Sequence, residues 1–179
     1  MFEFTRGTII LSALAIATAS QAPAQRSTNH VAVPAGLTVS EVHSRLWVRF
    51  NDLWTNVRVS GAAAEQRRTL VRFIKRDVLQ QLDREAATIY PVFDSVSAGG
   101  FATKAARFDG QMINRLANEL EADVNSRERT LFGERGYALA IALESYFTKT
   151  DQLVWPVIQA QLSPLAMQTL VARIESFDN

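Results

Sequence analysis

The sequence predicts an all-α protein, an antiparallel up-down bundle of four long helices with a short fifth helix at the C-terminal end. Apolar residues recur every three or four positions in four long segments, and no segment alternates with a period of two for long. Short connections join the segments, which favours antiparallel neighbours. An apolar-aromatic-Pro-Val-apolar pattern occurs twice, at residues 89–93 and 154–158. The repeat indicates that the second and fourth helices occupy matching positions in two related hairpins.

Length and composition limit the classes of function. The 179 residues suffice for one domain with a sizeable core, and 47% of them are hydrophobic. The net charge of +1, without a long block of one sign, argues against a nucleic-acid surface or a polybasic membrane patch. The absence of cysteine excludes disulfides, thiolate catalysis and iron–sulfur clusters. Only two histidines are present, His30 and His43.

The N-terminal residues predict export. An apolar stretch at residues 7–20 is followed by Ala22-Pro23-Ala24, which is typical of a secretory signal peptide cleaved after Ala24. The alternative is an uncleaved anchor, but the apolar stretch is too short to span a bilayer comfortably. We therefore expect a signal peptide at 1–24, a flexible leader at 25–37 and a helical domain at 38–177. The mature protein is expected in the periplasm or secreted, without a membrane attachment.

The first two helices are expected at the N-terminal end of the domain. Thr38 or Ser40 can cap the first, with Glu41 in its first turn, and Ser60-Gly61 ends it. The second runs from about residue 62 to 93. The inner face of the first combines His43 with Leu46, Phe50, Trp54 and Val57, and that of the second comprises Ile74, Val78, Gln81, Glu85 and Ile89.

The remaining helices are expected at about residues 101–124 and 137–162, with a break flanked by Gly133 and Gly136 between them. Ser163 followed by Pro164 predicts the start of the last short helix. Either proline motif is expected to end or kink its helix. The inward rows are Phe108, Met112, Leu116 and Leu120 beside Asp109 and Ile113, then Leu139, Leu143, Tyr146, Thr150, Leu153 and Val157, then Leu170, Ile174 and Phe177.

These inward rows carry polar groups that a plain core would not. Polar side chains spaced by four on the inner face of a bundle are how such folds build metal sites, and a buried carboxylate needs a partner or a cation. The polar residues concerned are His43, Gln81, Glu85, Asp109, Tyr146 and Thr150.

Together with the two proline motifs, these residues resemble a hemerythrin-like domain of the His-His-Glu cation-binding type. The resemblance covers about residues 38–177. It implies a four-helix bundle that binds non-heme iron, often two irons, in proteins that carry, sense or reduce oxygen species. Residue by residue, His43 matches the first-helix histidine, Glu85 the bridging carboxylate and Asp109 the acid of the third helix.

The other family ligands are replaced in this chain. Gln81 stands where the second-helix histidine is expected and Gly110 where the third-helix histidine is expected. Tyr146 replaces the fourth-helix histidine and Thr150 its glutamate. Three of four expected histidines are therefore missing, and the di-iron site is expected to be largely lost.

Each of the four candidate metal ligands also has a structural interpretation; these ligands are His43, Glu85, Asp109 and Tyr146. His43 can lie half exposed at the bundle mouth or bond to Glu85, which we favour because a metal needs several convergent donors. Glu85 can be a ligand or an acid–base group, or can pair with His43, Arg45 or Arg84. Asp109 can be an acid in a first helical turn, and Tyr146 and Thr150 can be core hydroxyls, with that of Tyr146 bonded to Glu85 or Gln81.

Three functions follow. We favour a non-catalytic binding or structural module without a cofactor, in which a His43–Gln81–Glu85–Tyr146 hydrogen-bond network fills the former metal site. The alternative is a protein that binds one iron, manganese or zinc ion and has a sensing, storage or oxygen-related role. An enzyme acting on oxygen or peroxide is the least supported, since no other catalytic motif is present. The sequence identifies no partner, and a protein partner stays open.

Overall fold

The computed structural model describes residues 38–59, 63–97, 100–126 and 129–175, and within these ranges the protein is all-helical, without a strand. The predicted all-α class is therefore confirmed. The predicted signal peptide at 1–24 and leader at 25–37 lie outside the described residues. None of the described helices combines the length and apolar character needed to cross a membrane.

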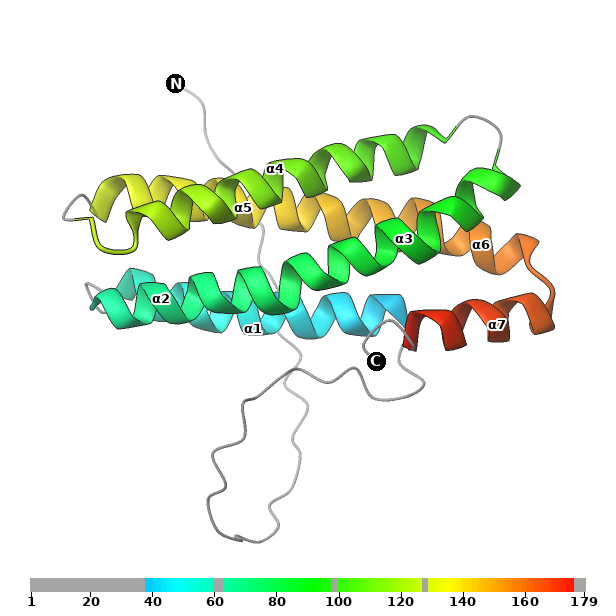
Figure 1. Ribbon diagram of the computed structural model, residues 1–179, viewed down its shortest axis with the longest axis horizontal. Coiled ribbons are helices and arrows are strands. Elements are labelled where there is room, and N and C mark those ends of the chain that lie inside the picture. The colour runs from blue at the N-terminus through cyan, green and yellow to red at the C-terminus, as the bar shows by residue number, and fades with distance from the viewer. Residues whose placement is uncertain (1–37, 60–62, 98–99, 127–128, 176–179) are drawn as a thin grey trace, which may run out of the picture.

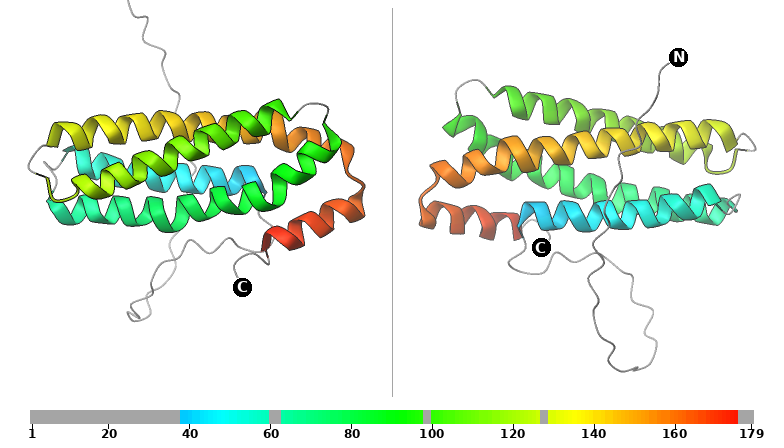
Figure 2. Two further views of the ribbon diagram at one scale, coloured as in Figure 1. Left: turned by 45° about the horizontal axis from the view of Figure 1, so that its top comes forward. Right: turned by 180° about the vertical axis from the view of Figure 1, so that it is seen from behind.

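Four long helical segments lie side by side along the long axis of the molecule (Figures 1 and 2). The core lies between them, since α1 packs on α2 and α5, and α4 packs on α3 and α5. A short last helix packs against α3. In chain order the elements are α1 (Val39–Val59), α2 (Ala64–Phe73), η1 (Ile74–Val78), α3 (Leu79–Val96), α4 (Phe101–Asp123), α5 (Arg129–Lys149), η2 (Thr150–Val154), α6 (Trp155–Gln161) and α7 (Pro164–Glu175).

Two predicted helix starts are confirmed by their caps. At α1 the Glu41 backbone N–H donates to Thr38 Oγ1 at 3.3 Å, and the Thr38 N–H donates to Glu41 Oε2 at 2.8 Å, a reciprocal capping box. At α7 the Ala166 N–H donates to Ser163 Oγ at 3.3 Å, and Pro164 is the first helical residue. Both caps satisfy donors that the first helical turn leaves without intrahelical partners.

The segments η1 and η2 are π-helical. The Leu79 N–H donates to the carbonyl of Ile74, and the Trp155 N–H to that of Thr150, each five residues earlier. The wider turn moves the buried face of the fourth long segment by one residue. Leu153, predicted to be inward, is 52% exposed, whereas its neighbour Val154 is buried. One turn later Ile158 is buried and Val157 only partly so.

The proline motifs do not end their helices. The helical segment continues for five residues beyond Pro91, to Val96, and for five residues beyond Pro156, to Gln161. The two π segments do not stand in equivalent places, since η1 ends 13 residues before Pro91 and η2 ends two residues before Pro156. Proline has no N–H to donate, so Pro156 leaves a carbonyl of the adjoining η2 segment without its usual partner.

The predicted break at Gly133 and Gly136 is wrong, because both lie inside α5, which begins at Arg129. Gly136 instead permits a close helix–helix approach. A Cβ there would overlap the Cη2 and Cζ3 atoms of Trp54 on α1, so the glycine makes room for the indole ring. The predicted inward position of Phe108 is also wrong, since its side chain is exposed, whereas the inward positions predicted for Ile113, Leu116 and Leu120 are confirmed.

Candidate functional site: a buried charged network

Glu85 of α3 is the centre of a buried hydrogen-bond network, and its side chain is 0% exposed. Its Oε1 lies 2.6 Å from His43 Nε2 of α1 and accepts a hydrogen bond from Gln81 Nε2 at 2.7 Å. Its Oε2 accepts a hydrogen bond from the Tyr146 hydroxyl of α5 at 2.8 Å. The predicted network of these four residues is therefore confirmed, as is the predicted pairing of Tyr146 with Glu85.

The second ring nitrogen of His43 also faces a carboxylate. Its Nδ1 lies 2.8 Å from Oδ1 of Asp151, in η2. A carboxylate only accepts, so a histidine that donates from both nitrogens must be an imidazolium cation. Burial alone would lower the pKa of His43, but the charge of Glu85 and the hydrogen bonds to Asp151 and Glu85 outweigh it and raise the pKa to about 9.

His43 is enclosed on its remaining sides. The ring of Phe147 stacks on it at a centroid distance of 4.3 Å and an interplanar angle of 25°, and Tyr146 presents an edge at 6.2 Å. His43 is only 1% exposed, so of its two structural interpretations the bond to Glu85 is confirmed and the half-exposed position at the bundle mouth is wrong. Asp151 is the part of the network that reaches water, because its side chain is 25% exposed.

A further polar contact fixes the orientation of Gln81. Arg84 Nη1 donates to Gln81 Oε1 at 3.0 Å, which identifies the opposite end of the amide as the nitrogen that donates to Glu85. Arg84 thus acts on Glu85 through Gln81. The chain of contacts runs from the guanidinium of Arg84 through Gln81 and Glu85 to His43 and Asp151.

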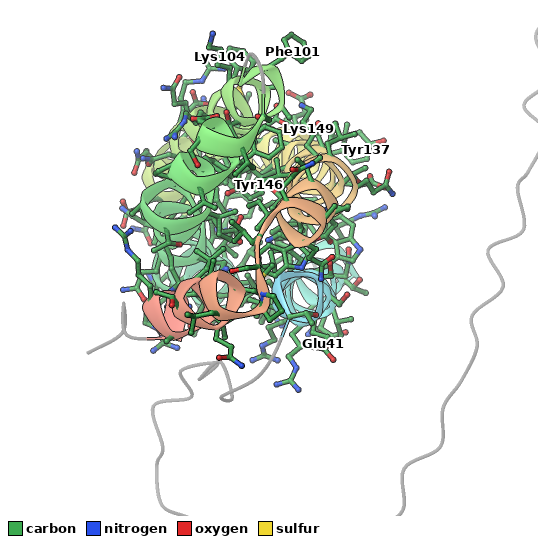
Figure 3. The ribbon with its side chains drawn as sticks, turned by 90° about the vertical axis from the view of Figure 1, so that its right-hand side faces the viewer. Glu41, Phe101, Lys104, Tyr137, Tyr146 and Lys149 are labelled. Atoms are coloured by element: carbon green, nitrogen blue, oxygen red, sulfur yellow. The ribbon has the colours of Figure 1, made fainter. Side chains whose placement is uncertain are left out.

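Tyr146 and Tyr90, two buried tyrosines near Glu85, remain neutral. Burial, followed by the negative charge of Glu85, raises the pKa of Tyr146 well above its usual value, and the same two causes raise that of Tyr90. In Figure 3 the Tyr146 side chain lies between the green helices α3 and α4 and the orange α6. Tyr90 and Thr150 lie nearby, but their buried hydroxyls make no hydrogen bond of suitable geometry.

The structure brings three of the four candidate metal ligands together and places Asp109 apart from them. Asp109 Oδ2 contacts Lys149 Nζ and accepts a hydrogen bond from Ser145 Oγ at 3.0 Å (Lys149 is labelled in Figure 3). Asp109 is also the ninth residue of α4 and not an acid of its first turn, which corrects that interpretation. At the neighbouring Gly110, a Cβ would make ordinary contacts with Leu82 and Tyr146.

Asp151 and Phe147 were not recognised from the sequence. They are spaced by four residues, as expected for one face of a helix, and together they cover one side of His43. Asp151 follows Thr150, the position that an α-helical period selects after Tyr146. The predicted inward row passed through Tyr146 and Thr150, so the neighbouring row of Phe147 and Asp151, which faces His43, was not considered.

The donors present do not fit a di-iron centre. Both nitrogens of His43 point at carboxylates, and Glu85 already accepts hydrogen bonds at both oxygens. Within the described residues, no group of three or more His, Asp or Glu side chains is arranged to hold a metal ion. No family model, curated protein or solved structure matches the chain. The site itself is a carboxylate–imidazolium–carboxylate network inside an all-helical protein.

Proposed function

We propose that this protein is an exported, hemerythrin-like four-helix up-down bundle whose di-iron site has been replaced by the charged network, and that it is a non-catalytic binding or structural module. Support for the bundle comes from the four long segments, which run in alternating directions along the molecule (Figure 1), and from their contacts. Support for export to the periplasm comes from the signal-peptide pattern at residues 1–24.

The main support for the loss of the metal site is that two carboxylates, those of Glu85 and Asp151, contact the two ring nitrogens of His43. A histidine binds a metal through the lone pair of a neutral imidazole, and an imidazolium has none to offer. With a His43 pKa of about 9, the protonated form outnumbers the neutral form about 100-fold at pH 7. A metal ion would have to displace this proton in order to bind. The hydrogen bonds that hold Glu85 would also have to be broken.

Elemental mass spectrometry of the mature protein, residues 25–179, tests the proposal. The protein should be purified from its own periplasm without a metal-affinity column. The expected result is far less than one metal ion per chain, together with a helical circular-dichroism spectrum and a melting temperature that EDTA does not change. Near-stoichiometric iron would overturn it.

A single bound cation is the second candidate, because two carboxylates, Glu85 and Asp151, face the ring of His43 from its two nitrogens. A cation that replaced the proton on His43 would bind more tightly as pH rises, by up to tenfold per unit until about pH 9. Zn²⁺ titrations at pH 6, 7 and 8 distinguish the two. Binding with this slope that Glu85→Ala abolishes would establish the second candidate, and no saturable binding would eliminate it.

A further inference from the structure

A basic groove lies between α2–η1 and α4, away from the charged network. Its volume is about 560 Å³, and it is lined on one side by Arg68, Arg72, Lys75 and Arg76. Positions 68, 72, 75 and 76 follow the three- and four-residue spacing of one helix face. Val71 and Val124, both buried, also line the groove. The groove is therefore a concavity and not simply a convex solvated face.

Arg72 lies between two residues, Arg68 and Lys75, whose side chains make contacts across the groove. Arg68 Nη2 donates to Asn125 Oδ1 at 2.7 Å, and Lys75 pairs with Glu121 of α4. Arg72 stands between these two crossings, four residues from one and three from the other. Its nearest carboxylate is Glu65, at 4.0 Å, and its side chain is 63% exposed. Such a loose ion pair contributes little to stability, so the guanidinium can turn to a better partner.

The lining carries four cationic side chains and one carboxylate, that of Glu121. Guanidinium groups match the tetrahedral oxygens of phosphate through paired hydrogen bonds, and such charge-assisted bonds are the strong ones. The volume exceeds that of a phosphate group and falls in the range of small-molecule sites. None of the exposed large apolar side chains belongs to its lining, so the groove offers no apolar anchor for a bilayer.

We propose that the groove binds a soluble phosphate monoester of about the size of a sugar phosphate. Arg72 holds the phosphate at the centre, Arg68 and Lys75 contact it from the two sides, and the organic group lies over Val71 and Val124. This inference goes beyond the proposed function and does not depend on the state of the charged network, since none of these residues belongs to it.

Calorimetric titration of the protein at low ionic strength tests the site, with inorganic phosphate, glucose 6-phosphate and glucose as probes. Both phosphates are expected to bind with a dissociation constant on the order of 1 mM or tighter, glucose 6-phosphate more tightly, and glucose not at all. Raising the salt concentration to about 0.3 M should weaken binding several-fold. An absence of heat with either phosphate up to about 10 mM would overturn the inference.

Three variants locate the site. Arg72→Gln should weaken phosphate binding by about tenfold or more. Arg115→Gln is the matched control, because Arg115 is a comparably exposed arginine on α4 outside the groove, with a side chain 64% exposed, and it should bind as the parent does. Glu121→Gln should strengthen binding several-fold, because it removes the carboxylate that competes for Lys75.

The variants can contradict the inference separately. Equal losses in Arg72→Gln and Arg115→Gln would mean that only net charge attracts the anion. Weaker or unchanged binding in Glu121→Gln would place the anion elsewhere. Vesicles containing phosphatidic acid form the last arm, and binding to them without binding to soluble phosphates would assign the groove to a membrane surface. Metal analysis of the same sample reports independently on the proposed function.

Discussion

Asp151 Oδ1 lies 2.8 Å from Nδ1 of His43, while Glu85 Oε1 lies 2.6 Å from Nε2 of the same ring. The imidazolium is thus held between a carboxylate that is fully buried and one that partly reaches water. Buried ion pairs are costly to break from one side, because the remaining charge stays in the protein interior without a partner. The stability of this protein should therefore depend on the proton of His43.

The free energy of unfolding should fall as pH rises from about 6.5 to about 9. The folded state binds the His43 proton more tightly than the unfolded chain, whose histidine has a pKa near 6.5. The stabilisation is fully present below pH 6.5 and is lost as pH approaches 9, a change on the order of 3 kcal/mol. Urea unfolding at half-unit pH intervals measures it. In His43→Gln this fall should disappear, and an equally steep fall in that variant would assign it to another group.

Glu85→Gln should destabilise the protein by about 3 kcal/mol or more, because it removes the buried negative charge facing His43. Glu65→Gln provides the comparison. The Glu65 side chain is exposed and, among the described residues, pairs with Arg68 and Arg72, so its loss should change the free energy of unfolding by less than about 0.5 kcal/mol. Denaturant unfolding at pH 7 measures both. Similar values for the two variants would show that the buried pair adds nothing to stability.

Tyr146→Phe and Tyr90→Phe should differ although both hydroxyls are buried. The Tyr146 hydroxyl donates to Glu85, and its removal should cost about 1–3 kcal/mol. The Tyr90 hydroxyl makes no hydrogen bond of suitable geometry to the described residues and does not reach the carboxylate, so its removal should cost less than that of Tyr146. Thermal and denaturant unfolding of the two single variants test this. A larger loss in Tyr90→Phe than in Tyr146→Phe would contradict the network described here.

Gly136→Ala and Gly133→Ala should have opposite effects. Alanine favours a helix by about 1 kcal/mol over glycine, and nothing lies within 4 Å of a Cβ at Gly133, so that variant should be more stable. A Cβ at Gly136 collides with the indole of Trp54 and should cost about 1–3 kcal/mol in spite of the better helix former. Melting temperatures of the pair measure the difference. Stabilisation of both variants would show that α1 and α5 separate easily.

Local signals in the sequence account for much of the fold. The capping residues Thr38 and Ser163 and the inward face from Ile74 to Ile89 follow from short-range spacing, and the structure confirms them. The four-residue network around Glu85 could also be predicted, because buried polar side chains on inward faces must form hydrogen bonds with one another. Gly136 was misread as a break because its reason is a tertiary contact with Trp54, about 80 residues earlier, which no local pattern contains.

The role of Asp151 was missed for a different reason. It lies on the row of Phe147, beside the row of Tyr146 and Thr150, and no sequence pattern shows which of two neighbouring rows faces His43. The local sequence also does not state where a π turn replaces an α turn, which is why Leu153 was placed inward in the position of Val154. Asp109 was wrongly grouped with the network, because its match to a family ligand position does not show that its side chain contacts Lys149. Secondary structure was therefore predictable, whereas the rotation of side chains beyond η2 and the choice of charged partners needed the folded molecule.

In evolutionary terms, η2 is equivalent to the insertion of one residue into an otherwise regular α-helix. Deleting one residue there would let the turn close with α-helical spacing and would leave the later side chains of that helix on the faces that they now occupy. Val154 and Ile158 would stay in the core. A deletion in a regular part of the same helix would instead rotate the side chains beyond it by about 100°. Descendants of this chain should therefore tolerate the loss of one residue within η2 more readily than the loss of one elsewhere in this helix.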